Sequence, residues 1–303
     1  MMRTSAAIVA VGFLVVAMLG WMAPGAAPPQ IVSAEGGDFA RVQDAIDVAE
    51  DGAVIVIRAG TYRENLAVAR PVTLLAEDGV VLEPADGDQP AVTVEGTQAV
   101  AIHGLTIRRA AVGCQISVDS CTVSGCSISA TKIGIEIVAF DGDIVSIVDT
   151  VLRSDGYGVG VQVTGSGVTL LARCRLHGFG TGILLGGAGT AVVQGCSAEG
   201  CYEAVVVSSS TSALLVGNVL MGNHASAIRL EPAPGALRVG PLCLIGNVIQ
   251  DNDGWGLTLC GLDGSAADTS FGRVTGSGNR VTGNGRGRLC PGDLRLPDGF
   301  LTD

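Results

Sequence analysis

The chain of 303 residues is long enough to bury a sizeable core, and its net charge is −11. Such an acidic chain, whose single lysine is Lys132, repels nucleic acids and anionic membrane surfaces, so we expect no nucleic-acid partner. Glycine is frequent at 45 residues, whereas charged residues make up 16% and aromatic residues 4%, which indicates tight turns and an aliphatic core.

The N-terminus has the pattern of an export signal. Arg3 precedes an uninterrupted apolar run over residues 6–22, and small residues follow at 23–27. We expect residues 1–27 to be a signal peptide and the mature protein to be secreted or periplasmic. The apolar run is also close to the lower limit for a membrane span, so a retained N-terminal anchor is the alternative and the only membrane contact expected.

The next elements read as one helix and several short strands. Residues 38–50 have apolar positions at helical spacing, with Asp38 as the expected N-cap, and we expect this helix to cover the N-terminal end of the domain. Strand-like aliphatic runs follow at 54–57, 72–75, 80–82 and 91–94.

From residue 105 onward the sequence repeats a single pattern, first every 21 to 24 residues and then after 29 and 32 residues. An aliphatic residue stands three positions before seven of the eight anchor residues, and another stands two positions after all eight. The anchors are Leu105, Cys126, Thr150, Cys174, Cys196, Asn218, Asn247 and Asn279. Each repeat holds two alternating strands, with room for a third, so successive repeats must stack in parallel to bury their aliphatic faces. The sequence therefore predicts an all-β fold, a right-handed parallel β-helix over residues 31–285, with residues 286–303 as a capping tail.

Nine cysteines in an exported chain suggest disulfides, and their odd number leaves at least one thiol unpaired. Cys174 and Cys196 fall on adjacent repeats, but their parallel side chains favour a ladder of free thiols. Better disulfide candidates are Cys201, Cys243, Cys260 and Cys290.

The N-terminal part resembles a known superfamily. The residues that carry the resemblance are 37–39, 42–46, 55–57, 60–65 (Gly-Thr-Tyr-Arg-Glu-Asn) and 72–74. They resemble the N-terminal segment of pectin-lyase-like β-helix proteins. This group includes pectin methylesterases, polygalacturonases, polysaccharide lyases and non-catalytic NosD-type repeat proteins. The resemblance implies the same fold over about residues 31–285. The Gln-Asp-Thr-Leu motif of the methylesterases is replaced by residues 129–134, and the polygalacturonase motifs are missing, which favours the non-catalytic branch.

One outward column and the turn after it form the candidate site. The column lies three residues past the anchors, and the turn carries aromatic residues on separate repeats. Aromatic rings stack on sugar faces, while charged side chains bond hydroxyls or carboxylates, so we predict a carbohydrate-binding face. Its residues are Arg153, Tyr157, His177, Phe179, Glu199, Tyr202 and Trp255. The simpler interpretation is a solvated face whose aromatics cover turn backbones.

No catalytic group can be assigned from the sequence. A glycosidase needs two carboxylates at a fixed separation, and Glu199 has no evident partner. A lyase could use Arg153, His177 or Lys132, but the acidic chain disfavours polyuronates. The three histidines fall in different columns, so no metal site and no cofactor are expected. We expect an exported protein that binds a carbohydrate polymer on its lateral face without turnover. The alternatives are a polysaccharide lyase or glycoside hydrolase, and a structural or partner-binding envelope scaffold.

Overall fold

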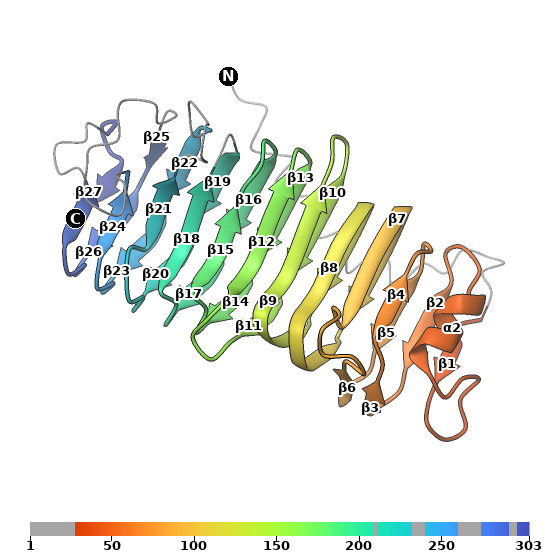
Figure 1. The fold of residues 1–303 in the computed structure, drawn as a ribbon. Helices are drawn as coiled ribbons and strands as arrows, with labels where there is room; N and C mark the ends of the chain where they lie inside the picture. The colour runs from red at the N-terminus through yellow and green to blue at the C-terminus, as the bar shows by residue number, and fades with distance from the viewer. Residues whose placement is uncertain (1–27, 209–210, 232–239, 260–273, 291–295, 303) are drawn as a thin grey trace.

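The predicted parallel β-helix is confirmed. A computed structural model describes residues 28–208, 211–231, 240–259, 274–290 and 296–302. The predicted signal peptide and Cys260 lie outside these residues. The described strands all pair in parallel and wind into about 11 turns that stack along one axis (Figure 1). Within the described residues, no helix is both long and apolar enough to cross a membrane.

Three parallel sheets run along the axis, here called sheets I, II and III in the order in which each turn meets them. Sheet I contains β1 (Gln30–Val32), β2 (Val54–Ile57), β5 (Thr73–Ala76), the end of β7 (Val92–His103), the end of β8 (Thr106–Ser124), β10 (Ile144–Val148), β13 (Val168–Ala172), β16 (Thr190–Gln194), β19 (Ser212–Val216), β22 (Leu242–Ile245) and β25 (Val274–Ser277).

Sheet II is made of short strands. It contains β3 (Gly60–Arg63), β6 (Val80–Glu83), the start of β8, the start of β9 (Ser127–Ala139), β11 (Val151–Arg153), β14 (Arg175–His177), β17 (Ser197–Glu199), β20 (Val219–Met221), β23 (Val248–Gln250), β26 (Asn279–Thr282) and β28 (Leu301–Thr302). Sheet III contains β4 (Leu66–Val68), the start of β7, the middle of β8, the end of β9, β12 (Val159–Gly165), β15 (Thr181–Leu185), β18 (Glu203–Ser208), β21 (Ile228–Glu231), β24 (Trp255–Thr258) and β27 (Gly287–Cys290).

The aliphatic positions that recur in the sequence form the continuous core. In sheet I, Ile147, Leu171 and Val193 occupy equivalent positions on successive strands and are fully buried. Since neighbouring strands of a sheet lie about 4.8 Å apart, each of these side chains packs directly on its counterpart in the next turn. Burying one such side chain stabilises the fold by about 1.5–3 kcal/mol, and the column repeats that contribution along the axis.

The N-terminal helix is shorter than predicted and is capped differently. Helix α2 spans Val42–Val48, and Arg41, not Asp38, occupies its N-cap position. The Asp38 carboxylate instead accepts a hydrogen bond from the Ile31 N–H (2.8 Å). The buried carboxylate of Glu64 accepts hydrogen bonds from the helix N–H groups of Val42 (2.9 Å) and Gln43 (3.0 Å). A carboxylate at a helix N-terminus satisfies free N–H groups and the helix dipole together, so a turn of the solenoid caps this helix.

The anchor residues form a ladder at the corner between sheets I and II. Asn247 lies at the centre of this ladder. Its side-chain oxygen accepts hydrogen bonds from the backbone N–H (2.9 Å) and from Nδ2 (2.9 Å) of Asn218. Its own Nδ2 donates to the Leu215 carbonyl (2.9 Å) and to Asn279 Oδ1 (2.9 Å). Cys196 continues the ladder by donating its N–H to Asn218 Oδ1 (2.9 Å). Each amide thus joins two turns through bonds shielded from water.

A second ladder lies five residues further on, at the corner between sheets II and III, and sequence analysis missed it. Asn223 donates its N–H (3.0 Å) and Nδ2 (2.7 Å) to Asn252 Oδ1, which is buried with it. Asn252 repeats the arrangement with Asn284 (3.2 and 2.8 Å). At the other end, the Cys201 N–H donates to Asn223 Oδ1 (3.0 Å). The signal was the Asn-x4-Asn spacing that recurs in three repeats.

The β-helix extends beyond its predicted end at residue 285. Strand β27 pairs with β24, and β28 pairs with β26, so part of the tail completes another turn. Phe300 is buried, and its carbonyl accepts a hydrogen bond from Asn279 Nδ2 (3.1 Å) at the last rung of the first ladder. The described part of the tail therefore packs on the last turn of the core, and a capping role for residues 286–303 as a whole stays a prediction.

We predict that Asn247→Ala destabilises the fold by about 2–5 kcal/mol, because it leaves the Asn218 N–H and the Leu215 carbonyl buried without partners. Gln194→Ala is the matched control, since this amide points outward from sheet I; it should change stability by less than about 0.5 kcal/mol. Urea unfolding followed by circular dichroism measures both. Equal losses for the two variants would contradict the ladder's role.

Candidate functional site

The predicted outward column exists. Arg153, His177 and Glu199 pair with one another on successive strands of sheet II, and all three side chains are exposed. Tyr157 lies on the turn beyond Arg153 and is 82% exposed, and Tyr202 lies beyond Glu199 and is 57% exposed. These residues therefore share one side of the solenoid, on or just beyond sheet II.

Phe179 is not part of this surface, which corrects the prediction. Its side chain is fully buried at 0% exposure. Phe179 stands five residues after the Cys174 anchor, as Cys201 stands five residues after Cys196. It therefore occupies the inward position of the second ladder, and its ring fills the core where later turns place an asparagine. A side chain without accessible surface cannot stack on a ligand.

A groove of about 430 Å³ brings Tyr202 and Trp255 together near the C-terminal end of the solenoid, where sheet II turns into sheet III. We call it the Tyr202–Trp255 groove. It is lined by Tyr202, Glu203, His224, Ala225, Ser226, Arg229, Asp253, Gly254, Trp255, Thr258, Arg286 and Cys290. The other predicted residues do not line it. Seven polar residues that were not predicted do: Glu203, His224, Ser226, Arg229, Asp253, Thr258 and Arg286.

One edge of the groove is a line of side chains that follows the second ladder. Tyr202, His224 and Asp253 come directly after Cys201, Asn223 and Asn252. Backbone bonds from the N–H of His224 to the Cys201 carbonyl (2.8 Å) and from the N–H of Asp253 to the Asn223 carbonyl (2.8 Å) hold them on adjacent turns. His224 Nδ1 lies 3.5 Å from Asp253 Oδ2, and both side chains are exposed.

A largely buried ion pair between Arg229 and Glu203 forms part of the groove lining. Arg229 donates from Nε (2.6 Å) and Nη2 (2.8 Å) to the two carboxylate oxygens of Glu203, and from Nη1 (2.5 Å) to Glu231. Burial alone would lower the pKa of Arg229, but its hydrogen bonds to Glu203 and Glu231 and their charges raise that pKa. Bidentate geometry of this kind holds both side chains in place and leaves neither charge free in the interior.

The opposite wall is held by Trp255. Its backbone N–H donates to Ser226 Oγ (3.4 Å), and the Ser226 hydroxyl bonds Thr258 Oγ1 (2.8 Å). The indole ring lies against Gly287, where a side chain would start 2.9 Å from the ring. The groove therefore offers two aromatic faces, fixed hydroxyls, and the charged ends of His224, Asp253 and Arg286. Such a set suits recognition of a polyhydroxylated ligand.

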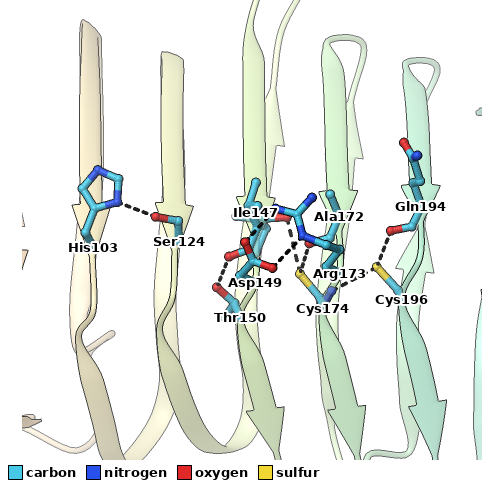
Figure 2. Close-up of polar contacts among 11 residues, drawn as sticks. His103, Ser124, Ile147, Asp149, Thr150, Ala172, Arg173, Cys174, Gln194 and Cys196 are labelled. Atoms are coloured by element: carbon cyan, nitrogen blue, oxygen red, sulfur yellow. Dashed lines mark hydrogen bonds and ion pairs between the residues drawn. The ribbon is translucent and has the colours of Figure 1, made fainter. Parts of the chain in front are cut away.

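Of the described cysteines, Cys290 alone lines the groove. The eight cysteines in the described part of the chain are free, so the predicted disulfide candidates Cys201, Cys243 and Cys290 are unpaired. Cys174 donates its N–H to Cys196 Sγ (3.4 Å), which extends the first ladder as the expected pair of free thiols (Figure 2). Burial raises the pKa of Cys121 to about 12 and that of Cys126 to about 11. These thiols stay protonated at neutral pH and cannot act as nucleophiles.

The corner that carries the first ladder also holds polar pairs on its outer side. Arg173 makes two hydrogen bonds of 2.7 Å to the carboxylate of Asp149 on the neighbouring turn (Figure 2). Hydrogen bonds from this guanidinium lower the pKa of Asp149. Both residues have positive φ (53° and 50°), the conformation that glycine supplies at this corner in later turns. The pair is structural, and among the described residues no group of three or more His, Cys, Asp or Glu side chains is arranged to hold a metal ion.

The profile of the family described as "right handed beta helix region" matches residues 90–291. The chain belongs to the right-handed β-helix family. No curated protein sequence matches it. Solved structures similar to this β-helix include pectate lyase Pel9A, with a TM-score of 0.58, 11% identity, and 92% of this chain and 80% of that chain covered.

Two epimerases are also similar. For the periplasmic alginate epimerase AlgG the TM-score is 0.57 at 14% identity, with 82% of this chain and 67% of that chain covered. For the mannuronan C-5 epimerase AlgE4 A-module of Azotobacter vinelandii, the TM-score is 0.56 at 15% identity, with 92% and 96% covered. At such identities the likeness shows the fold alone.

We predict that, among the described cysteines of the folded protein, Cys243 reacts first with iodoacetamide at neutral pH. Its side chain is partly accessible, whereas Cys114, Cys121 and Cys126 are buried and have raised pKa values. Mass spectrometry of peptides after timed labelling measures the order. Equal labelling of Cys121 and Cys243 without denaturant would contradict this description, and full labelling in urea would confirm that the thiols are free.

Proposed function

We propose that this β-helix binds a glycan polymer in the Tyr202–Trp255 groove without cleaving it. The observation that carries the proposal is the placement of two aromatic side chains in one groove with several hydrogen-bonding groups. The two groups best suited to proton transfer, His224 and Asp253, stand exposed to water. Glu203, the buried carboxylate, is already occupied by Arg229. This arrangement favours recognition over chemistry, because catalytic groups work best where water is excluded.

The remaining surface side chains would extend the binding face. Arg153, Tyr157, His177 and Glu199 belong to turns that precede the groove along the same side of the solenoid. From the turn of Arg153 to that of Trp255 there are four steps of about 4.8 Å, or about 19 Å in all. A polymer chain lying along the axis would contact this exposed column first and then enter the groove.

The comparisons support a glycan as the partner. The similar structures include proteins named as an alginate epimerase, a mannuronan C-5 epimerase and a pectate lyase, so this fold serves proteins of polysaccharide chemistry. One of them is named as periplasmic. We propose the same class of partner here, a secreted or periplasmic location directed by residues 1–27, and a place in the NosD-type, non-catalytic branch of the family.

A second candidate function is a polysaccharide lyase or epimerase. The observation that favours it is the His224–Asp253 pair at 3.5 Å, with Arg286 in the same groove. A histidine oriented by a carboxylate is a suitable general base, and an arginine can hold the carboxylate of a uronate beside the proton to be removed. A glycoside hydrolase is less well supported, since Glu203 is bound to Arg229.

The test is retention of the purified protein on insoluble or immobilised alginate, pectin, cellulose and chitin. We predict that Tyr202→Ala combined with Trp255→Ala weakens retention on the bound glycan at least about tenfold, as expected for the loss of two central aromatic contacts. Phe140→Ala is the matched control: this ring is also exposed, but it lies at the turn between sheets III and I. It should leave retention unchanged.

The same incubations separate the candidate functions. Unsaturated products that His224→Ala abolishes would establish the lyase, and new reducing ends without unsaturation would establish a hydrolase. Altered uronate stereochemistry without cleavage would establish the epimerase. Retention that survives the loss of both aromatic residues would refute the groove as the binding site. No retention on any glycan would refute the proposal and favour an envelope scaffold.

A further inference from the structure

The outer face of sheet I carries no Asp, Glu, Lys or Arg side chain on any of its described strands. One column of this face contains Leu170, Val192 and Leu214 on successive strands. The adjacent column contains Val148 and Ile245. Sheet II differs sharply, because its outward column contains Arg153, His177 and Glu199. Sheet I therefore presents an uncharged wall on an otherwise charged solenoid.

The wall is uncharged and combines apolar side chains with polar ones such as Thr122, Ser124 and Gln194, and its most exposed apolar residues lie at the strand ends. Ile144 is 54% exposed, and Ile245 is 40% exposed. The one helix among the described residues, α2, lies at the N-terminal end of the solenoid, so no described helix covers the wall (Figure 1). Parallel sheets are ordinarily covered on both faces, and large exposed apolar patches mark interaction surfaces. This face therefore has the composition of an interface.

Its size matches a small protein–protein interface. About 11 turns at about 4.8 Å give a length of about 50 Å, and strands of three to five residues give a width of about 12 Å. One face thus offers about 600 Å², and a pair of faces about 1,200 Å², which is the lower end of the range for specific complexes. A partner that covers the whole wall must itself be long, flat and apolar.

A second copy of this chain meets these requirements. Each chain carries a net charge of −11, so two copies repel each other wherever charged faces meet. The uncharged wall is the face on which the described residues present no like charges to a copy. We propose that two copies pair through sheet I, face to face about 10 Å apart, in a twofold dimer. The groove between sheets II and III stays open in this dimer, so the proposal is independent of glycan binding.

The test is sedimentation of the purified protein over a concentration series from about 1 to 100 µM, which spans the dissociation constants of weak dimers. With rising concentration, the wild type should shift from the mass of one mature chain toward twice that mass. Leu170→Glu buries a carboxylate in the interface and should raise the dissociation constant at least about tenfold. Leu184→Glu is the matched control, because Leu184 is a half-buried leucine on the outer face of sheet III. It should dimerise like the wild type.

A second measurement uses the native thiol of Cys243, which extends the column of Leu214 on the wall. Its labelling by iodoacetamide should slow as the wild-type concentration rises, and should not slow in Leu170→Glu. Thermal unfolding of each variant confirms that the fold is intact. A wild type that stays monomeric at about 100 µM, or equal dissociation by Leu170→Glu and Leu184→Glu, would overturn the dimer and assign the wall to a different partner.

Discussion

Register between neighbouring turns is the constraint on which this structure depends. Each inward side chain packs on its equivalent in the next turn, and a slip of one residue would turn the aliphatic face outward. The two ladders prevent this slip, because the side-chain oxygens of Asn247 and Asn252 each accept two hydrogen bonds from the preceding turn. The three-residue strands of sheet II lie between the ladders and are fixed at both ends.

The candidate site is a consequence of the same register. Tyr202, His224 and Asp253 form a line because each follows a member of the second ladder. Strand β21 pairs with β18 and β24, and these pairings bring Arg229 beside Glu203 and place Trp255 across the groove. The backbone gives these side chains a fixed spacing along the axis, so their attachment points are set before any ligand arrives. Such preorganisation lowers the entropy lost on binding.

The repeat pattern was sufficient to predict the solenoid, its aliphatic columns, the column of anchor residues and the outward column of Arg153, His177 and Glu199. These features follow from spacing alone. Phe179 was wrongly predicted to point outward. It shares an inward position with Cys201 and Asn223 of the next two turns, and these three residue types are so different that the sequence does not show the shared position. Asp38 was a plausible cap by residue type, but the cap is Glu64, which approaches from a different turn. The groove depends on packing between turns of unequal length, which no local pattern encodes.

Amide hydrogen exchange tests most directly whether the ladders hold the turns together. The N–H groups of Cys196, Asn218 and Asn247 donate to ladder side chains, so they should exchange only through global unfolding and belong to the slowest in the protein. The N–H of Gly142, in an exposed turn, should exchange many times faster. Comparable rates for Asn247 and Gly142 would contradict the account, because the turns would then separate locally without breaking the rest of the fold.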